Sequence, residues 1–234
     1  MFSDFIAHTL FYEKACKSVE ILKEYWDGCT DIYLENDYLV FQSGLHSNNF
    51  DSHLQILHDR HWQNGAINVL DAGCGIGSVT KHFAKLHPEA HFTCLNISSK
   101  QIELGNKELS DNIEFVEGSF DDMPFEDNSF DFIYFYQSIG YRPLVKTLNE
   151  AHRVLKPGGK IIISDMCSVE DPDPQDSIWL RYVQEIWHYM CYPVWYHIEA
   201  ARALNFNVLD HNPNMNAILD YSKWIELCDK GLSQ

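Results

Sequence analysis

A short apolar strand that runs directly into a glycine-rich turn is the feature that most constrains this chain. Residues 67–71 read Ile-Asn-Val-Leu-Asp, and glycines follow at positions 73, 75 and 77. Glycine has no Cβ, so the backbone can turn tightly there and approach a ligand closely. Residues 78–87 have a helical pattern, and the free N–H groups of that helix would face the same crevice. Together these segments predict a nucleotide-like cofactor site at the end of a strand.

The spacing of the glycines separates two classes of cofactor. In the dinucleotide-binding fingerprint, the third small residue stands about five positions after the first glycine. Here Ser78 occupies that position, and the third glycine comes earlier, at Gly77. Asp71 precedes the turn and would repel a pyrophosphate, whereas it suits a ligand with an ammonium group. The turn therefore favours S-adenosylmethionine, which has an ammonium and no phosphate, over NAD or FAD.

Further apolar segments with strand character follow at residues 90–96, 113–118, 130–136 and 160–165. Helical segments separate most of them, and this alternation predicts an α/β fold. The sheet should be doubly wound and mostly parallel, with helices on both faces. Residues 205–210 can supply a sixth strand, followed by a helix at 221–229, but no good seventh strand follows. A sheet that lacks its last antiparallel strand exposes an edge, so a homodimer stays an open prediction.

Three motifs resemble those of the class I S-adenosylmethionine-dependent methyltransferases, in the same order and spacing. They are residues 69–77 (Val-Leu-Asp-Ala-Gly-Cys-Gly-Ile-Gly), 123–131 (Met-Pro-Phe-Glu-Asp-Asn-Ser-Phe-Asp) and 153–160 (Arg-Val-Leu-Lys-Pro-Gly-Gly-Lys). The resemblance implies a Rossmann-like methyltransferase fold with S-adenosylmethionine as donor and S-adenosylhomocysteine as product. Shorter stretches, at 25–33 and 95–106, are similar to the sterol and geranyl diphosphate C-methyltransferases.

The resemblance assigns parts of the donor to individual residues. Asp71 is expected to order the loop and to receive the ammonium group, directly or through water, and Gly73 and Gly75 are expected to lie against the methionine part. Asn96 stands about 20–25 residues beyond the glycines, where a ribose-reading side chain belongs. Asn96 could instead cap the helix that starts near Ser98.

The adenine is expected near Ser119 and Phe120, at the end of the third strand. Many relatives have an aspartate at the position of Ser119, and serine is a weaker acceptor; Phe120 could equally be ordinary core. The other residues expected at the cofactor are Tyr25, Gly44, Ile97, Gln101, Tyr136 and Gln137.

Gln137 and Tyr141 are the candidate catalytic residues, because they follow the fourth strand, where donor and acceptor should meet. In the sterol and geranyl diphosphate enzymes a glutamate at the place of Gln137 is thought to stabilise or deprotonate a carbocation. Glutamine cannot act as an anion. Either another base takes the proton, or the acceptor is a heteroatom that needs little acid–base help, or Gln137 contacts only cofactor or backbone.

Residues 177–197 are dense in aromatic side chains. The predicted substrate pocket consists of Trp179, Tyr182, Trp187, Tyr189 and Trp195. Several side chains between 179 and 189 share one helical stripe by i, i+3, i+4 spacing, which is typical of core packing. Aromatic faces also attract cations within about 6 Å, so such a pocket suits a carbocation or an amine.

Charge and composition exclude several classes of partner. The net charge of −17, with 34 acids against 17 lysines and arginines, disfavours nucleic acid. No run of about 18 apolar residues is present, so no membrane span is expected. The N-terminus has an acid and no basic segment, so it is no secretory signal. Seven cysteines without a CxxC pair predict a reducing, cytoplasmic compartment.

A chain of 234 residues is most simply one methyltransferase domain. Residues 1–65 are expected to form a helical N-terminal lid and 66–166 the cofactor-binding core. Residues 167–234 would form an aromatic-rich substrate lid and a C-terminal strand and helix.

No metal site is expected. His53, His58 and His61 are interpreted as a solvated helix face, and the acidic stretch 171–176 as an exposed loop. Mg²⁺ would enter only if the substrate were a diphosphate.

The predicted function is methylation of a small, largely apolar molecule, most simply C-methylation of an isoprenoid or terpenoid. The alternatives are N- or O-methylation of a small amine or of a phenol or quinol, and a non-catalytic cofactor-binding protein.

Overall fold

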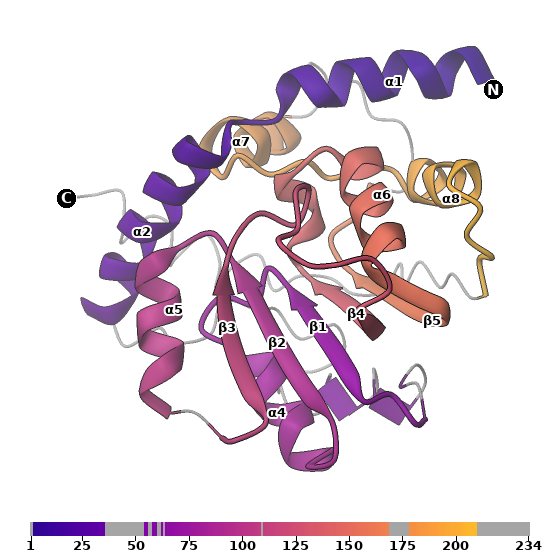
Figure 1. The fold of residues 1–234 in the computed structure, drawn as a ribbon. Coiled ribbons are helices and arrows are strands. Elements are labelled where there is room, and N and C mark those ends of the chain that lie inside the picture. The colour runs from indigo at the N-terminus through magenta and orange to yellow at the C-terminus, as the bar shows by residue number, and fades with distance from the viewer. Residues whose placement is uncertain are drawn as a thin grey trace.

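Parallel strands form one sheet in this computed structural model, which describes residues 2–35, 54–55, 58–59, 62, 64–108, 110–168 and 178–209. Within those residues the sheet has five strands, in the order β3-β2-β1-β4-β5 (Figure 1). The strands are β1 Asn68–Ala72, β2 His91–Asn96, β3 Ile113–Glu117, β4 Phe130–Tyr136 and β5 Leu155–Ser164. All neighbouring pairs are parallel. Because the strand order reverses between β1 and β4, their carboxyl ends frame the crevice in which open α/β sheets bind ligands.

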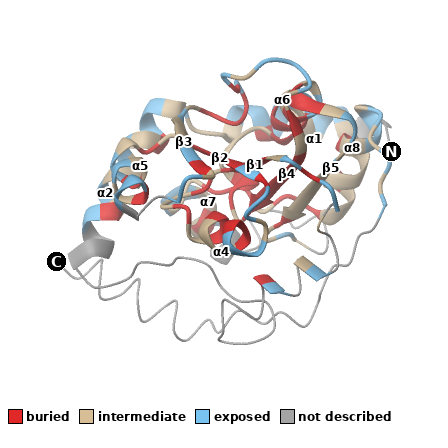
Figure 2. Ribbon diagram, turned by 60° about the horizontal axis from the view of Figure 1, so that its bottom comes forward, coloured by how far each residue is buried: buried red, intermediate tan, exposed pale blue. Residues whose placement is uncertain are grey.

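Helices cover both faces of the sheet, because each strand points its side chains alternately to either side. In β1, Val69 packs in the core beneath α4, whereas Leu70 packs in the core beneath α6 and α8. The helices are α1 Phe2–Ala15, α2 Val19–Glu35, α4 Ser78–Leu86, α5 Ser99–Gly105, α6 Leu144–Val154, α7 Ile178–Ile186 and α8 Val194–Ala203, with single 3-10 turns η1 Asn106–Glu108 and η2 Ile139–Tyr141. Figure 2 shows the strands buried between these helical layers. The predicted doubly wound α/β fold is confirmed.

The strand segments predicted from the sequence up to residue 165 are all present. β4 is buried along almost its whole length, which explains why its sequence is apolar or aromatic at every position except Asp131. β5 begins earlier than predicted, at Leu155, and its pairing with β4 is irregular between Phe130 and Phe132. In the described ranges no helix has the length and apolar character that a membrane crossing requires.

The sixth strand predicted at residues 205–210 is wrong in its described part, 205–209, which has no strand structure. Asn205 has a left-handed φ of 63° and ends α8. The Phe206 amide donates to the Ala201 carbonyl at 2.9 Å and the Asn205 amide to the Arg202 carbonyl at 3.0 Å. This pair of hydrogen bonds is a Schellman motif, and it turns the chain back toward α8. Asp210 and the helix predicted at 221–229 lie outside the described residues.

The helical stripe predicted across residues 179–189 also stops early. α7 ends at Ile186, and His188 has a left-handed φ of 57° that is incompatible with a continuing helix. Tyr189 is therefore not on the stripe. It lies in the connection between α7 and α8 and is buried, with 2% of its surface exposed.

Candidate active site

The glycine-rich turn connects β1 to α4 in a left-handed backbone conformation. Gly73, Gly75 and Gly77 have φ values of 87°, 58° and 79°, a region that residues with a Cβ rarely adopt. A Cβ on Gly73 would lie 2.5 Å from the Ser138 Cβ, so packing against the segment after β4 also requires glycine there. At Gly75 the nearest atom to a Cβ would be the Gln101 Oε1, at 3.8 Å. Gly75 therefore has open space in front of it, as a backbone that receives a ligand needs.

Asp71 lies beneath this turn and is 1% exposed. The Thr80 hydroxyl, from the first turn of α4, donates to the Asp71 Oδ2 at 2.6 Å, and the Tyr134 hydroxyl lies 2.9 Å from the same Thr80 oxygen. Burial raises the pKa of Asp71 to about 7, although hydrogen bonds from Thr80 and Tyr134 oppose the shift. These contacts join β1, β4 and α4, so the carboxyl group fixes the base of the turn.

Asn96 is the last residue of β2, and its side chain contacts the glycine-rich turn. Its Nδ2 donates to the Gln101 Oε1 at 2.8 Å and to the Gly75 carbonyl at 3.3 Å. The alternative that Asn96 caps α5 is wrong, because Ser98 is the N-cap and its hydroxyl accepts from the Gln101 amide at 3.2 Å. With the amide nitrogen engaged, Oδ1 is the Asn96 atom suited to accept a hydrogen bond from a ligand. Ile97, the next residue, is half-buried.

At the end of β3, the Ser119 hydroxyl donates to Asp121 in a short hydrogen bond. Arg142 binds the same carboxylate through two contacts of 2.8 Å, from Nε and Nη2. Burial disfavours the charged form of Asp121, but the hydrogen bonds from Arg142 and Ser119 outweigh it and lower the pKa to about 2. Phe120 packs edge-on against Phe135, with 5.6 Å between ring centroids, so it contributes to the core as well as to this strand end.

The end of β4 carries an unusual backbone. Gln137 has a left-handed φ of 51°, and its amide donates to the Ser164 carbonyl at 2.8 Å. Such a conformation costs about 1–3 kcal/mol in a residue with a Cβ and commonly occurs at functional sites. The Ser138 hydroxyl then donates to the Ala72 carbonyl at 2.6 Å. The segment after β4 is thus held against the end of β1, beside the glycine-rich turn.

Asp165 follows β5 directly and is a site residue that the sequence motifs did not reveal. Its carboxylate accepts hydrogen bonds from the Ile139 amide at 3.0 Å, from the Met166 amide at 2.6 Å and from the Tyr189 hydroxyl. Burial raises its pKa to about 7 against the opposing effect of the backbone hydrogen bonds. The available sequence signal is an acid directly after an apolar strand, the same pattern that identifies Asp71.

Helix α2 is attached to the same edge of the sheet. Its Asp27 accepts a hydrogen bond of 2.6 Å from the Ser98 hydroxyl, and its Asp31 contacts Lys100 at 2.5 Å. Lys23 forms an ion pair with Glu117 at the end of β3. These three contacts place α2 across the carboxyl ends of β2 and β3.

Aromatic rings from α2, η2 and the connection after α7 meet beside Gln137. Tyr141 packs edge-on against both Trp26 and Tyr189, at centroid distances of 5.3 and 4.7 Å. Tyr25 packs edge-on against His188 at 5.1 Å. We call Tyr25, Trp26, Tyr141, His188 and Tyr189 the aromatic cluster.

The five residues predicted to form the substrate pocket are not brought together. Tyr189 belongs to the aromatic cluster, whereas Tyr182 and Trp187 pack against each other at 5.8 Å. Trp195 packs against His8 at 5.2 Å, in the layer of α1 and α8. The Trp179 side chain and Gly44 lie outside the described residues.

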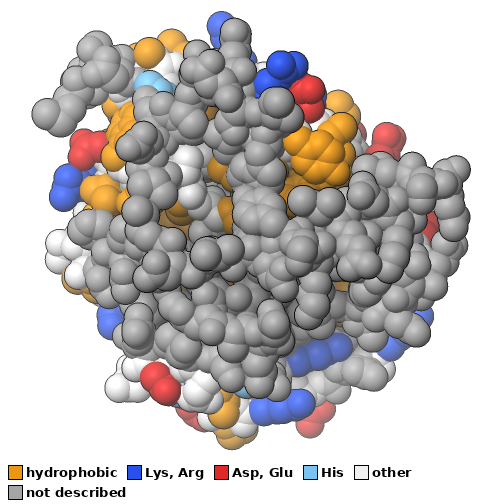
Figure 3. Space-filling model, turned by 180° about the vertical axis from the view of Figure 1, so that it is seen from behind, with side chains coloured by type: hydrophobic (Ala, Val, Ile, Leu, Met, Phe, Trp, Pro, Cys, Tyr) orange, Lys and Arg blue, Asp and Glu red, His pale blue; other side chains and the backbone are white. Residues whose placement is uncertain are grey.

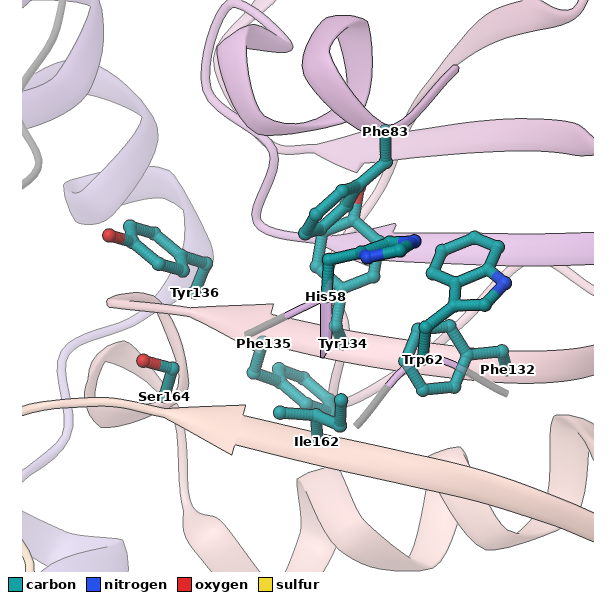
Figure 4. A pocket seen from close by; sticks show the side chains of 9 residues that line it. All are labelled: His58, Trp62, Phe83, Phe132, Tyr134, Phe135, Tyr136, Ile162 and Ser164. Atoms are coloured by element: carbon teal, nitrogen blue, oxygen red, sulfur yellow. The ribbon is translucent and has the colours of Figure 1, made fainter. Parts of the chain in front are cut away.

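A small recess, partly open to solvent, borders the site on the α4 face of the sheet (Figure 4). Its walls are mostly aromatic, and Tyr136 and Ser164, the last residues of β4 and β5, line one end. The lining residues are His58, Trp62, Phe83, Phe132, Tyr134, Phe135, Tyr136, Ile162 and Ser164.

Within the described part of the chain, no group of three or more His, Cys, Asp or Glu side chains could hold a metal ion. His58 instead pairs with His87, at 2.8 Å between their Nε2 atoms. His53, His61, Asp171, Asp173 and Asp176 lie outside the described residues. On the face drawn in Figure 3, the described basic side chains lie apart from one another around the rim, some beside acidic ones.

Comparisons with known proteins agree with this arrangement. Residues 70–163 match a family model described as "Methyltransferase domain". A sterol 4-C-methyltransferase of Caenorhabditis elegans is 31% identical over 186 residues, 73% of this chain and 55% of that protein. A ubiquinone/menaquinone biosynthesis C-methyltransferase of Brucella canis is 38% identical over 110 residues, 44% of this chain and 41% of that protein. The chain thus spans about half the length, or less, of these curated relatives.

Solved structures share the fold. A [4+2]-cyclase, SpnF, has a TM-score of 0.78 at 19% identity, over 93% of this chain and 84% of that chain. A geranyl diphosphate methyltransferase in complex with geranyl diphosphate and sinefungin has a TM-score of 0.64 at 16% identity, over 79% of each chain. Identities this low show a common fold and nothing more. The family match over residues 70–163, with the sterol and quinone relatives, shows that this chain contains a class I S-adenosylmethionine-dependent methyltransferase domain.

Proposed function

We propose that this protein transfers the methyl group of S-adenosylmethionine to a small, largely apolar acceptor at the carboxyl ends of β1, β2 and β4. The observation that carries the proposal is the pairing of an open, left-handed Gly75 with Asn96 at the end of the next strand. Gly75 leaves room for the methionine part of the donor, and the Asn96 Oδ1 can accept from a ribose hydroxyl. Both groups are neutral, as suits a cofactor without phosphates.

The remaining cofactor contacts follow from the same geometry. Ser119 and Phe120 follow β3, on the side of the sheet edge where the adenine would extend. The Ser119 proton is already donated to Asp121, so Ser119 can act toward the base only as an acceptor. The other residues proposed to surround the donor are Tyr25, Ile97, Gln101, Tyr136 and Gln137, with the backbone of Gly73.

The acceptor would lie between Gln137 and the aromatic cluster. The sulfonium of the cofactor supplies an activated methyl group. The protein holds the acceptor in line with it and excludes water, and both effects accelerate group transfer. Gln137 and Tyr141 are polar groups beside this position and are the proposed contacts to the acceptor.

An isoprenoid-type carbon acceptor is the form of the proposal that the relatives support best, since two of them are named for C-methylation in sterol and quinone chemistry. A neutral Gln137 favours a second candidate, N- or O-methylation of a small amine, phenol or quinol. The aromatic cluster fits either acceptor, because its faces can stabilise a carbocation or an ammonium ion.

A panel of acceptors tests the proposal. Release of S-adenosylhomocysteine would be measured by mass spectrometry with sterols, prenyl diphosphates, quinols, phenols and small amines, with and without Mg²⁺. Turnover with sterols or prenyl compounds supports C-methylation, whereas turnover with amines or phenols alone supports the second candidate. Tight binding of S-adenosylmethionine without turnover of any acceptor would indicate a non-catalytic binding protein.

A further inference from the structure

The Asp165 carboxylate joins three segments that are distant in sequence. The amides of residues 138–140, after β4, donate to it, and Ile139 is at 3.0 Å. The Met166 amide donates from the end of β5 at 2.6 Å, and the Tyr189 hydroxyl donates from the connection after α7. One side chain thus fixes the relative positions of all three segments.

The same segments frame the proposed acceptor position. Gln137 immediately precedes the residues whose amides bind Asp165, and the Tyr141 ring packs on Tyr189 at 4.7 Å. A Cβ on Gly140 would lie 2.5 Å from the Tyr189 ring, and the Gly140 carbonyl accepts from the Met190 amide at 2.8 Å. Packing this close leaves no room for the segments to move independently.

Asp165 holds this arrangement chiefly as an acceptor. Its described backbone partners are amide donors, and a carboxyl group with two oxygens can accept from several donors at once. The Tyr189 hydroxyl can donate or accept, so it stays bonded to the carboxyl group in either protonation state. The titratable groups near Asp165 are the Tyr189 phenol and the thiols of Cys167 and Cys191. Burial raises the pKa of the Cys191 thiol, so it stays neutral around pH 7, and Cys167 is exposed.

We propose that Asp165 is a positioning residue of this methyltransferase, whose carboxyl group holds residues 138–140 and Tyr189 where they orient Gln137 and Tyr141 toward the acceptor. The proposal rests on the proposed function for its catalytic consequence, but not for its structural one. When the Asp165 side chain is replaced, the segment after β4 loosens while the glycine-rich turn and Asn96 keep their geometry.

Amide hydrogen exchange followed by mass spectrometry tests the structural consequence without any substrate. In the wild-type protein, residues 138–140 should be protected from exchange, after correction for intrinsic rates. In Asp165→Asn that protection should fall about 10- to 100-fold. Asp165→Glu should recover part of it.

Asp131→Asn is the matched control, because the Asp131 Oδ2 accepts from the Asn68 amide at 2.8 Å and the Ile67 amide at 3.2 Å, at the amino end of the strands. The control should leave residues 138–140 protected. Equal protection in Asp165→Asn and the wild type, or an equal loss in the control, would overturn the proposal. If Asp165→Asn does not fold, the protection of residues 138–140 in Asp165→Glu decides.

Kinetics tests the catalytic consequence. With an acceptor from the panel, Asp165→Asn should have a kcat about 10- to 100-fold lower than the wild type. The Kd for S-adenosylmethionine should change less than kcat. Unaltered kcat in Asp165→Asn would overturn the positioning role alone, and failure of the wild type to bind S-adenosylmethionine would overturn the proposed function alone.

Discussion

Replacing Gly75 by alanine separates the role of the glycine-rich turn in cofactor binding from its role in folding. Gly75 has a φ of 58°, and placing an alanine in the left-handed region costs about 1–2 kcal/mol. The new Cβ would meet the Gln101 Oε1 at 3.8 Å, an ordinary contact, so no clash adds to this cost. The free energy of unfolding in urea should therefore fall by about 1–2 kcal/mol, and the variant should still fold.

Cofactor binding should suffer more than folding. The added methyl group would occupy the space in front of Gly75, where the proposed methionine part of the donor lies. A loss of about 1.4 kcal/mol in binding free energy raises a Kd tenfold. The steric conflict in Gly75→Ala should raise the Kd for S-adenosylmethionine by more than tenfold. Isothermal titration calorimetry with S-adenosylmethionine measures the change.

Gly158→Ala is the matched control. Gly158 has a φ of 80°, a Cβ placed on it would have no atom within 4 Å, and it lies in the amino-terminal half of β5, away from the turn. Its unfolding free energy should fall by the same amount as that of Gly75→Ala, with no change in cofactor affinity. Wild-type affinity in Gly75→Ala, or an equal loss of affinity in Gly158→Ala, would refute the assignment of the turn.

Three further variants test other parts of the site. Asn96→Ala should weaken S-adenosylmethionine binding about tenfold in calorimetry, because it removes the proposed ribose acceptor; unchanged affinity would contradict that role. Asp121→Ala should lower the unfolding free energy by about 3–5 kcal/mol, because it leaves Arg142 buried without its partner. Since the pKa of Asp121 is lowered to about 2, its contribution to the free energy of unfolding is fully present above about pH 4 and is lost as the pH falls through 2. Urea unfolding of the wild type and of Asp121→Ala at pH 3 and pH 6 measures both the loss of stability and its pH dependence. Asp71 has a pKa raised to about 7, so wild-type stability should fall as the pH rises from about 4 through 7. In urea unfolding, Asp71→Asn should remove the part of this decline that Asp71 causes. If the unfolding free energy of the variant depends on pH as that of the wild type does, the Asp71 carboxyl is not buried as described.

The sheet and the turn can be predicted from the sequence because both depend on local signals. Apolar runs mark strands that are buried on both faces, and the alternation with helices implies parallel pairing. The glycines at 73, 75 and 77 mark positions with a left-handed backbone, which is a local signal even where packing also requires glycine. The role of Asn96, at the end of β2, can be predicted from its distance along the chain from the glycine-rich turn. These parts of the structure agree with the prediction.

Contacts between distant segments cannot be predicted in the same way. Periodicity places Tyr189 on a helical stripe, but the left-handed His188 directs it toward Asp165 instead. Asp121 accepts hydrogen bonds both from Ser119 and from Arg142, which lies beyond β4 in the sequence. For residues 205–210 a local signal does exist, because asparagine after a helix is a common Schellman residue, and here it outweighs the β-like composition.

Release of S-adenosylhomocysteine from S-adenosylmethionine in the presence of the acceptor panel tests the central claim most directly. The proposed function predicts product with at least one sterol, prenyl or quinol acceptor in the wild-type protein and little product in Gly75→Ala. An absence of product with every acceptor, together with no detectable binding of S-adenosylmethionine, would contradict the proposed methyl transfer at this site.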